Sequence, residues 1–596
     1  MTFSGGGFRA AAFSLGTLAY LDRLCFTSAD MTAPGALLSH VSFISSASGG
    51  TITNALYSAY KHQGKSFRDV YDKLLKELSG EQMLEAAMNV LNTDSEWRQA
   101  GNEKRRNLIN AFAKVYDRVL FEGETFARFR DKTHVQNFEV CFNSTEFYRG
   151  LSFRFQTEGM GNKNEITGNK YLHFDVLYPD VLDALKLADI LAASSCFPMG
   201  FEPIVYPEDF TYEDSSGVLT KDALLQAMAC ENYQEEKKPL KVSFGLMDGG
   251  ITDNQGLYSV MLADKKRRSR IVPTPFDLII VTDVGSYFID AYRVPEEETE
   301  SVWRRKNIAG YLKMLKNISK ATRWITVAGS VILLASLACI FLYKEGILKN
   351  VSYISSGLLA IILGIRLLLG RVPVVRDVLS DPSKIDIKPF LQRSFHLDKY
   401  FSENVINKLI NFFQFTRVGV LKQMLKARIA SAMLMVSEIN LKQTRRLIYE
   451  MFYDDPSWDN RRMPNFIYEL SIYNIKSRTN RFKNPYRLKW VATEEDKELL
   501  LSGCEKMNTV AEDARLMGTT LWFDQLDSAD EKLKKIISAG QFTTCANLLE
   551  YIISIERKKL VFEPQVQISL EKVKHMLIKD WLDFKENPHF VYEGLI

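Results

Sequence analysis

Three glycine-bearing turns punctuate the first half of the chain, and each of them borders a short apolar segment. They lie within Ser4–Ala10, Val41–Thr51 and Lys241–Asn254. Strand-like and helix-like segments alternate between them, up to about Tyr292. This alternation is typical of an α/β fold with a largely parallel sheet, in which the turns at the carboxyl ends of the strands meet at one edge.

The second turn reads as strand, sharp turn and helix. Ser48 stands at the turn, with small Ser46 two residues before it and Gly50 two residues after it. Small neighbours suit a nucleophile elbow, because its backbone is strained and the next helix packs close to the strand. The pattern predicts Ser48 as a nucleophile at a helix N-terminus, where the dipole favours developing negative charge. The alternative is a serine- and glycine-rich loop without chemistry.

The third turn offers a carboxylate to activate that serine. An alternating strand ends at Asp248, and two glycines then turn the chain. A carboxylate at this strand end, on the same sheet edge as Ser48, could accept the serine proton directly. Asp253 is the competing carboxylate, and its position beside Asn254 favours a role in forming the turn.

The first turn predicts an anion-binding nest. The consecutive Gly5, Gly6 and Gly7 let backbone N–H groups point inward at the start of a helix. The spacing Gly5-x-Gly7-x-x-Ala10 also fits a dinucleotide fingerprint. That alternative needs a clear strand before the glycines and an acidic residue at the end of the next strand, and the sequence shows neither.

A serine–histidine–aspartate triad is disfavoured by the context of the histidines. None follows an acidic residue in a glycine-rich strand–loop segment, so all are interpreted as structural: His40, His62, His134, His173, His396, His575 and His589. The dispersed cysteines contain no CxxC pair, which favours free thiols in a reducing compartment over a zinc site: Cys25, Cys141, Cys196, Cys230, Cys339, Cys504 and Cys545.

Composition bounds the remaining possibilities. The 596 residues are too many for one ordinary core, so two or three structural units are expected. The net charge of +4 gives no case for nucleic-acid binding. The first residues carry no basic and apolar leader, so the catalytic part is expected to stay in the cytoplasm.

Two apolar runs, Ile325–Tyr343 and Val351–Leu369, predict a transmembrane helical hairpin over residues 324–370. Arg366 lies near the end of the second run, where it can reach the headgroups. Basic residues flank the pair on both outer sides, which places both termini in the cytoplasm. The alternative is a helical hairpin buried in a soluble core. The basic stretch at residues 300–323 is either a membrane-surface helix or a solvated one.

These segments divide the chain into a catalytic domain at 1–295, the basic stretch, the hairpin, and a mostly helical C-terminal region at 380–596. Within that last region, Ser528–Glu531 resembles a capping box, and it predicts a helix that ends at Gly540.

The three turns, in this order, resemble the patatin-like phospholipases. That family has a glycine-rich oxyanion loop ending in arginine, a serine elbow and an Asp-Gly-Gly turn, which here are Gly5–Arg9, Ser46–Gly50 and Asp248–Gly250. Phe142–Glu146, Ala192–Pro198 and Phe276–Asp283 are similar to further family segments, so the resemblance covers roughly residues 1–290. Ser46 departs from the family, which has glycine there, and the chain starts almost on the glycine loop.

The resemblance implies a three-layer α/β/α catalytic domain with a Ser48–Asp248 dyad. It implies that the backbone of Gly5, Gly6 and Gly7 holds the oxyanion, with Arg9 supporting that loop or its charge. It implies no metal and no organic cofactor.

The sequence as a whole therefore predicts a membrane-anchored serine lipid acyl hydrolase of phospholipase A type. Its substrate would be a membrane phospholipid, and its expected place is the bacterial inner membrane, with the catalytic and C-terminal parts in the cytoplasm. Two alternatives stay open at this point: a lipid acyltransferase, and a non-catalytic membrane scaffold whose C-terminal half binds a partner.

Overall fold

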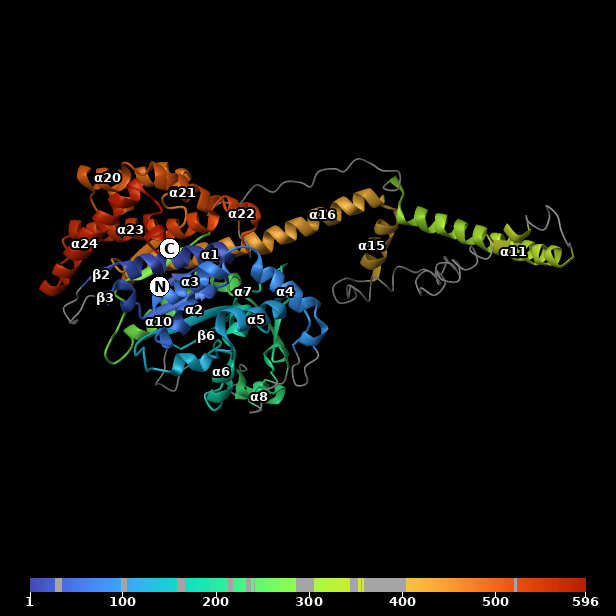
Figure 1. Ribbon diagram of the computed structural model, residues 1–596, viewed down its shortest axis with the longest axis horizontal. Helices are drawn as coiled ribbons and strands as arrows, with labels where there is room; N and C mark the ends of the chain where they lie inside the picture. Colours follow the sequence, from blue (N-terminus) through green and yellow to red (C-terminus); the bar gives the residue numbers. More distant parts are fainter. Residues whose placement is uncertain are drawn as a thin grey trace. The chain divides into compact units, whose positions relative to one another are not determined.

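The computed structural model places the chain in two compact units, one formed by residues 1–290 and 434–596 and the other by residues 291–433. The structure describes residues 1–26, 35–97, 104–157, 167–198, 200–212, 218–231, 237–240, 242–285, 305–342, 352–354, 356–357, 403–518 and 522–595. Figure 1 labels the elements of both units.

A mixed sheet forms the centre of the first unit. Its parallel part has the order β13-β12-β1-β4-β5, with bounds Arg462–Phe466, Ile279–Asp283, Thr2–Phe3, Phe43–Ala47 and Glu139–Glu146. Antiparallel strands continue it: β6 (Leu151–Gln156), β11 (Phe244–Asp248) and β8 (Ile204–Tyr206). The predicted α/β class is correct, although the sheet is less uniformly parallel than expected.

Smaller pairings complete the described strands. They involve β2 (Cys25–Phe26), β3 (Gly35–Ala36), β7 (Leu172–Phe174), β9 (Met228–Glu231) and β10 (Lys237–Pro239). The helices before residue 290 are α1 (Gly7–Arg23), α2 (Gly49–His62), α3 (Phe67–Glu77), α4 (Gln82–Asn92), α5 (Leu108–Tyr116), α6 (Pro179–Ala184), α7 (Leu187–Ser195), α8 (Lys221–Ala227), α9 (Gly250–Asp253) and α10 (Leu257–Arg268). Those after residue 440 are α17 (Leu441–Asp454), α18 (Ile475–Phe482), α19 (Pro485–Leu488), α20 (Glu494–Leu501), α21 (Glu505–Leu516), α22 (Gln525–Ala529), α23 (Lys532–Arg557), α24 (Pro564–Glu586) and α25 (Phe590–Gly594).

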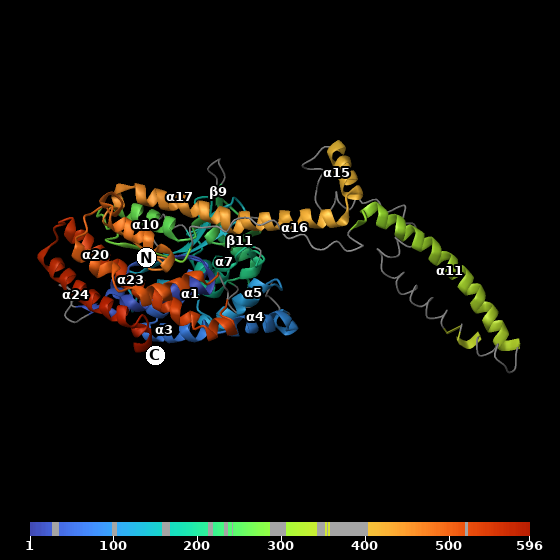
Figure 2. The same cartoon turned by 90° about the horizontal axis from the view of Figure 1, so that it is seen from above.

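Helices cover both faces of the sheet, because successive strand residues point to opposite sides. In β12, Ile279 and Val281 pack into a core with α10 and α17, whereas Ile280 packs into the larger core that contains α1 and α23. Figure 2 shows α10 and α17 on one face and α1 and α23 on the other. The layers are therefore α/β/α, as predicted.

Residues 434–596 do not form a compact unit of their own. They supply β13, which pairs with β12 in parallel, and they supply helices to both faces of the sheet. A buried ion pair joins the two parts, since Arg445 Nε lies 2.8 Å from Asp283 Oδ2, and the Tyr449 hydroxyl donates to the same oxygen at 2.7 Å. Residues 434–596 thus share one compact unit with residues 1–290.

The helix expected to end at Gly540 continues instead to Arg557 as α23. Gly540 lies opposite Gly16 of α1: a Cβ added at Gly540 would lie 2.4 Å from the Phe13 carbonyl oxygen, and one added at Gly16 would lie 2.1 Å from that of Ile537. The glycine thus serves close helix packing and not helix termination. The capping box in this region is formed by Asp524 and Asp527 ahead of α22, not by Ser528–Glu531.

In the second unit, one continuous helix, α11 (Ile308–Leu342), runs through most of the predicted basic stretch and the first apolar run. The Asn307 side chain accepts a hydrogen bond from Gly310 N at its start (2.7 Å) and donates to the Phe415 carbonyl at 3.3 Å. This contact ties α11 to the junction between α15 (Glu403–Phe415) and α16 (Val418–Leu434).

The transmembrane hairpin predicted over residues 324–370 is not shown by the structure. Across the described ranges, no helix combines the length and the apolar character that crossing a bilayer requires. The second apolar run, residues 351–369, lies almost wholly outside the described residues.

The glycine contact between α1 and α23 gives a stability prediction. Gly540→Val should lower the free energy of unfolding by about 1–3 kcal/mol, because the added carbons overlap the α1 backbone. Gly594→Ala is the matched control, since that helical glycine has open space around its Cα and alanine favours a helix. Denaturant midpoints measure both effects, and equal midpoints for Gly540→Val and the wild-type protein would contradict the packing role.

Candidate active site

Ser48 occupies a strained turn between β4 and α2. Its φ of 51° and ψ of −126° are rare for a residue with a side chain. Such backbone strain costs on the order of 1–3 kcal/mol and persists only where surrounding contacts enforce it. The turn sets the serine at the N-terminus of α2, as the nucleophile-elbow pattern predicted.

The residues around Ser48 are small because the first glycine loop packs directly against them. A Cβ added at Gly49 would lie 1.9 Å from the Gly7 carbonyl oxygen. A Cβ added at Gly5 would lie 3.1 Å from Ser48 Cβ. The structure therefore brings the predicted oxyanion loop into contact with the predicted nucleophile.

Strand β5 determines where Asp248 meets Ser48. The last residue of β4, Ala47, pairs with Asn143, and the last residue of β11, Asp248, pairs with Ser144. Both strands lie on the same side of β5, because β6 occupies the other side over the same residues. The ends of β4 and β11 thus meet at adjacent positions of one strand.

The carbonyl oxygen of Ser194 joins the two turns. It accepts hydrogen bonds from the backbone N–H of Ser48 and from that of Gly249, each at 3.1 Å. Ser194 lies in the last turn of α7, where carbonyl groups have no acceptor role within the helix and can serve other donors. The Cys196 carbonyl likewise accepts a hydrogen bond from the Asp248 N–H at 3.1 Å.

Ser46, where the family has glycine, takes part in a buried polar network beneath the elbow. Its hydroxyl lies 3.0 Å from Thr51 Oγ1, which in turn lies 2.9 Å from Ser194 Oγ. Asn143 Nδ2 donates to the Ser46 carbonyl at 2.9 Å. Sequence reasoning gave no role to Ser194 or Asn143, although both lie in segments that resemble the family.

The Asp248 carboxyl lies almost wholly out of water, with 6 % of the residue exposed. Burial raises its pKa to about 6, while hydrogen bonds from the Ser48 hydroxyl and the Gly250 N–H oppose the rise. The Gly250 N–H donates to Asp248 Oδ1 at 2.6 Å. Asp248 is therefore ionised at neutral pH, in contact with Ser48, and more basic than an ordinary aspartate.

The glycine loop leaves backbone donors at the start of α1. Gly6 and Gly7 have φ of 140° and 61°, conformations that favour glycine. The Gly5 N–H donates to the Asn254 carbonyl at 2.8 Å. The N–H groups of Gly6 and Gly7 have no acceptor within the described part of the chain. This is expected, because Gly6 precedes α1 and Gly7 is its first residue, and the first N–H groups of a helix have no partner within it.

Arg9, in the first turn of α1, contacts the C-terminal part of the first unit. Its guanidinium donates to the Met517 carbonyl, next to the end of α21. Burial lowers its pKa to about 10, and the negative charges of Asp283 and Glu438 oppose that shift. The arginine thus joins the glycine-loop helix to the C-terminal region.

Residues set aside in the sequence analysis have structural contacts. The Asp253 carboxylate accepts hydrogen bonds from the N–H groups of Tyr258 (3.1 Å) and Ser259 (2.9 Å) at the start of α10. His62 Nδ1 lies 2.8 Å from the Ser58 carbonyl in the preceding turn of α2, and His589 Nδ1 lies 2.8 Å from Ser538 Oγ. The preference for Asp248 over Asp253 agrees with these contacts.

Comparison with known proteins gives one result. Residues 1–261 match the model of the family described as patatin-like phospholipase. This part of the chain is a patatin-like phospholipase domain, and that family consists of lipid ester hydrolases. The match includes all three glycine-bearing turns and ends within α10. Neither the curated proteins nor the solved structures returned a match.

The buried carboxylate gives a pH-dependent stability prediction. The pKa of Asp248 in the folded chain lies above the ordinary value of 3.8, so the folded chain binds this proton more tightly than the unfolded chain does. The free energy of unfolding therefore falls as the pH rises from about 4 to about 6. Asp248→Asn removes this cost and should stabilise the protein by on the order of 1–2 kcal/mol at pH 7. The gain should vanish near pH 4.

Denaturant midpoints at both pH values measure the effect. Asp72→Asn is the matched control, since that carboxylate is exposed on α3 and is expected to give no gain. An equal effect of both substitutions would show that burial of Asp248 is not the cause.

Proposed function

We propose that Ser48 and Asp248 hydrolyse ester bonds of membrane glycerolipids, in a reaction of phospholipase A type. The patatin-like domain over residues 1–261 supports a serine lipid acyl hydrolase. The observation that carries the assignment of residues is the hydrogen bond between the Ser48 hydroxyl and the buried Asp248 carboxylate.

The first half of the reaction forms an acyl-enzyme. Asp248 accepts the proton of Ser48 while Oγ attacks the ester carbonyl carbon. The carbonyl oxygen becomes an oxyanion, and the N–H groups of Gly6 and Gly7 donate to it at the positive end of α1. Asp248 then gives its proton to the departing alcohol, which is a lysolipid, as the carbon–oxygen bond breaks.

The second half restores the enzyme. Water gives a proton to Asp248 and attacks the acyl carbon, and the same donors hold the second oxyanion. Ser48 Oγ leaves and takes back the proton from Asp248, and the fatty acid is released. This cycle uses side chains, backbone groups and water alone.

The substrate class suggests where the enzyme works. A glycerolipid with long chains resides in a bilayer, so the site has to act at a membrane surface. The location at the bacterial inner membrane, with the active site facing the cytoplasm, stays a prediction, and cell fractionation with a tagged full-length chain tests it.

Removing the nucleophile should abolish lipid release. Wild-type protein expressed in cells should raise free fatty acid and lysolipid levels, and Ser48→Ala should not, with an expected loss of activity of at least about 10³-fold. Lipid analysis by mass spectrometry measures the products. Ser79→Ala, which removes an exposed hydroxyl just after α3, is the control that should keep full activity.

A fluorophosphonate probe separates this function from a non-catalytic scaffold. Wild-type protein should react at Ser48, and the Ser48→Ala variant should remain unlabelled. Product release that is equal for wild type and Ser48→Ala would remove Ser48 from the mechanism. Transfer of the acyl group to an added alcohol, in place of fatty-acid release, would identify the protein as an acyltransferase.

The pKa of Asp248 predicts the acid limb of the pH–rate profile. Only the ionised carboxylate can accept the serine proton, so kcat/KM should fall about tenfold per pH unit below a midpoint near pH 6. A soluble short-chain ester serves as substrate, so that the pH does not alter a lipid surface. A limb centred near pH 4 would contradict a buried base.

A further inference from the structure

Three large apolar side chains are exposed at the tip of the hairpin that β5 and β6 form. Phe147 is 55 % exposed, Tyr148 is 44 % exposed and Leu151 is 37 % exposed. Single exposed apolar side chains are ordinary, but a group of them indicates an interaction surface. Residues 147–151 are called the apolar turn below.

The apolar turn lies on the same sheet edge as the candidate active site. Ser144 of β5 pairs with Asp248, and Phe147 follows three positions later, roughly 10 Å further along the strand. The Phe147 N–H donates to the Gly245 carbonyl at 2.9 Å, which keeps the turn beside β11, the strand that ends at Asp248. A surface that contacts the turn therefore lies near Ser48 and its base.

The carboxylate of Glu146 holds the apolar turn in this conformation. Glu146 is fully buried, and its Oε2 accepts the N–H groups of Tyr148 at 2.5 Å and Arg149 at 2.7 Å. Its Oε1 accepts the Leu151 N–H at 3.3 Å and a hydrogen bond from Asn169 Nδ2 at 3.4 Å. Such donors compensate a carboxylate that is out of water. These hydrogen bonds fix the backbone that carries the exposed side chains.

A neighbouring turn places aromatic and basic groups beside the apolar ones. Asn169, which donates to Glu146, accepts the Tyr171 N–H at 2.9 Å. The Arg149 guanidinium lies 4.6 Å from the centre of the Tyr171 ring, and Lys170 Nζ lies 5.5 Å from it. Tyrosine, lysine and arginine suit the boundary between lipid headgroups and acyl chains, because each has an apolar body and a polar end.

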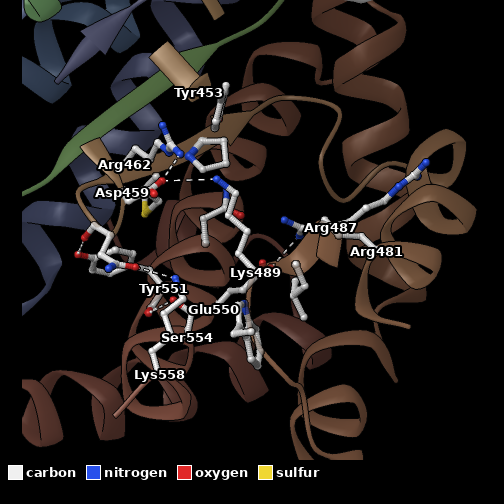
Figure 3. Close-up of a pocket in the computed structure, with 16 residues that line it drawn as sticks. Tyr453, Asp459, Arg462, Arg481, Arg487, Lys489, Glu550, Tyr551, Ser554 and Lys558 are labelled. Atoms are coloured by element: carbon white, nitrogen blue, oxygen red, sulfur yellow. Dashed lines mark hydrogen bonds and ion pairs between the residues drawn. The ribbon is translucent and has the colours of Figure 1, made fainter. Parts of the chain in front are cut away.

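The pocket between β13, α19 and α23 shows a contrasting arrangement (Figure 3). Its carboxylates already pair with its cations, since Glu550 lies 2.9 Å from Arg481 and Asp459 lies 3.5 Å from Lys489. Lys170, by comparison, has no carboxylate within 4 Å among the residues that the structure describes. Its charge beside the apolar turn is therefore available to an anionic group outside the chain.

We propose that the apolar turn docks the protein on a phospholipid bilayer. Phe147 and Leu151 enter the acyl chains, and the hydrophobic effect supplies the attraction. Tyr148, Tyr171 and Lys170 contact the headgroups, where the lysine charge favours anionic lipid. The inference rests on the proposed function, because the substrate of a lipid acyl hydrolase lies in a bilayer and the docked surface has to bring the candidate active site to it.

Flotation with vesicles of phosphatidylcholine and phosphatidylglycerol tests the docking surface. The full-length chain carries Ser48→Ala, so that hydrolysis does not alter the vesicles. Adding Phe147→Ser/Leu151→Ser should raise the lipid concentration for half-maximal binding at least about tenfold, because two apolar side chains no longer leave water. Thermal unfolding midpoints establish that the variant folds.

Ile271→Ser/Val272→Ser is the matched control for the loss of apolar surface. These exposed side chains lie between α10 and the amino end of β12, so they are on the opposite sheet edge from Ser48. The control pair should leave vesicle binding unchanged. Equal losses with both pairs would indicate a general effect of hydrophobicity, and a loss with the control pair alone would place the bilayer at the other edge. Either result overturns the proposal.

A charge substitution tests the contact with the headgroups. Lys170→Gln should weaken binding to vesicles that contain phosphatidylglycerol by about fivefold. Lys483→Gln, which removes an exposed charge from the C-terminal part, should leave that binding unchanged. Equal effects of both substitutions would remove Lys170 from the docking surface.

The proposal is also overturned if the Ser48→Ala chain does not bind vesicles, or if Phe147→Ser/Leu151→Ser changes self-association on gel filtration and not vesicle binding, since a second copy would then cover the turn. These measurements use no catalysis. Binding that needs the apolar turn, in a chain that releases no fatty acid, would refute the proposed reaction and keep the docking surface.

Discussion

The register of two strands along β5 is the constraint on which the candidate site depends. Because β4 and β11 end at adjacent positions of the same strand, the residues after and at those ends have to meet. The Ser194 carbonyl then fixes the two turns to each other through Ser48 and Gly249. A slip of one position would turn the side chains of a strand to the opposite face of the sheet. The pairing of β4 and β11 with β5 thus brings Ser48 and Asp248 into contact.

Two features of the same site lower the stability of the folded chain. Ser48 has a strained backbone, and Asp248 keeps a carboxylate out of water. Packing elsewhere has to offset both, and much of that packing comes from segments after residue 434. The contact of Gly16 with α23, the Arg9 contact with Met517 and the Arg445–Asp283 ion pair all join the patatin-like domain to the C-terminal part. Residues 434–596 are therefore a structural component of the unit that holds the candidate site.

The sequence predicted the local features well, and long-range contacts less well. Ser48, Asp248 and the glycine loop were predictable, because strained turns and close backbone approaches require small residues in a recognisable order. Gly540 was misinterpreted, because a glycine that ends a helix and one that allows two helices to touch are the same residue in a sequence. The direction of Arg9 was also beyond prediction, since its acceptor at Met517 lies more than 500 positions away.

The sequence by itself determined the alternation of strands and helices, the order of the three turns and the chemical groups that they carry, because these follow from local periodicity and from which residues fit a tight turn. Only the tertiary structure decided that β13 completes the sheet and that the Ser194 carbonyl bridges the turns of Ser48 and Asp248. Those arrangements depend on packing between segments hundreds of residues apart. A local sequence pattern does not indicate which distant segment a residue will contact.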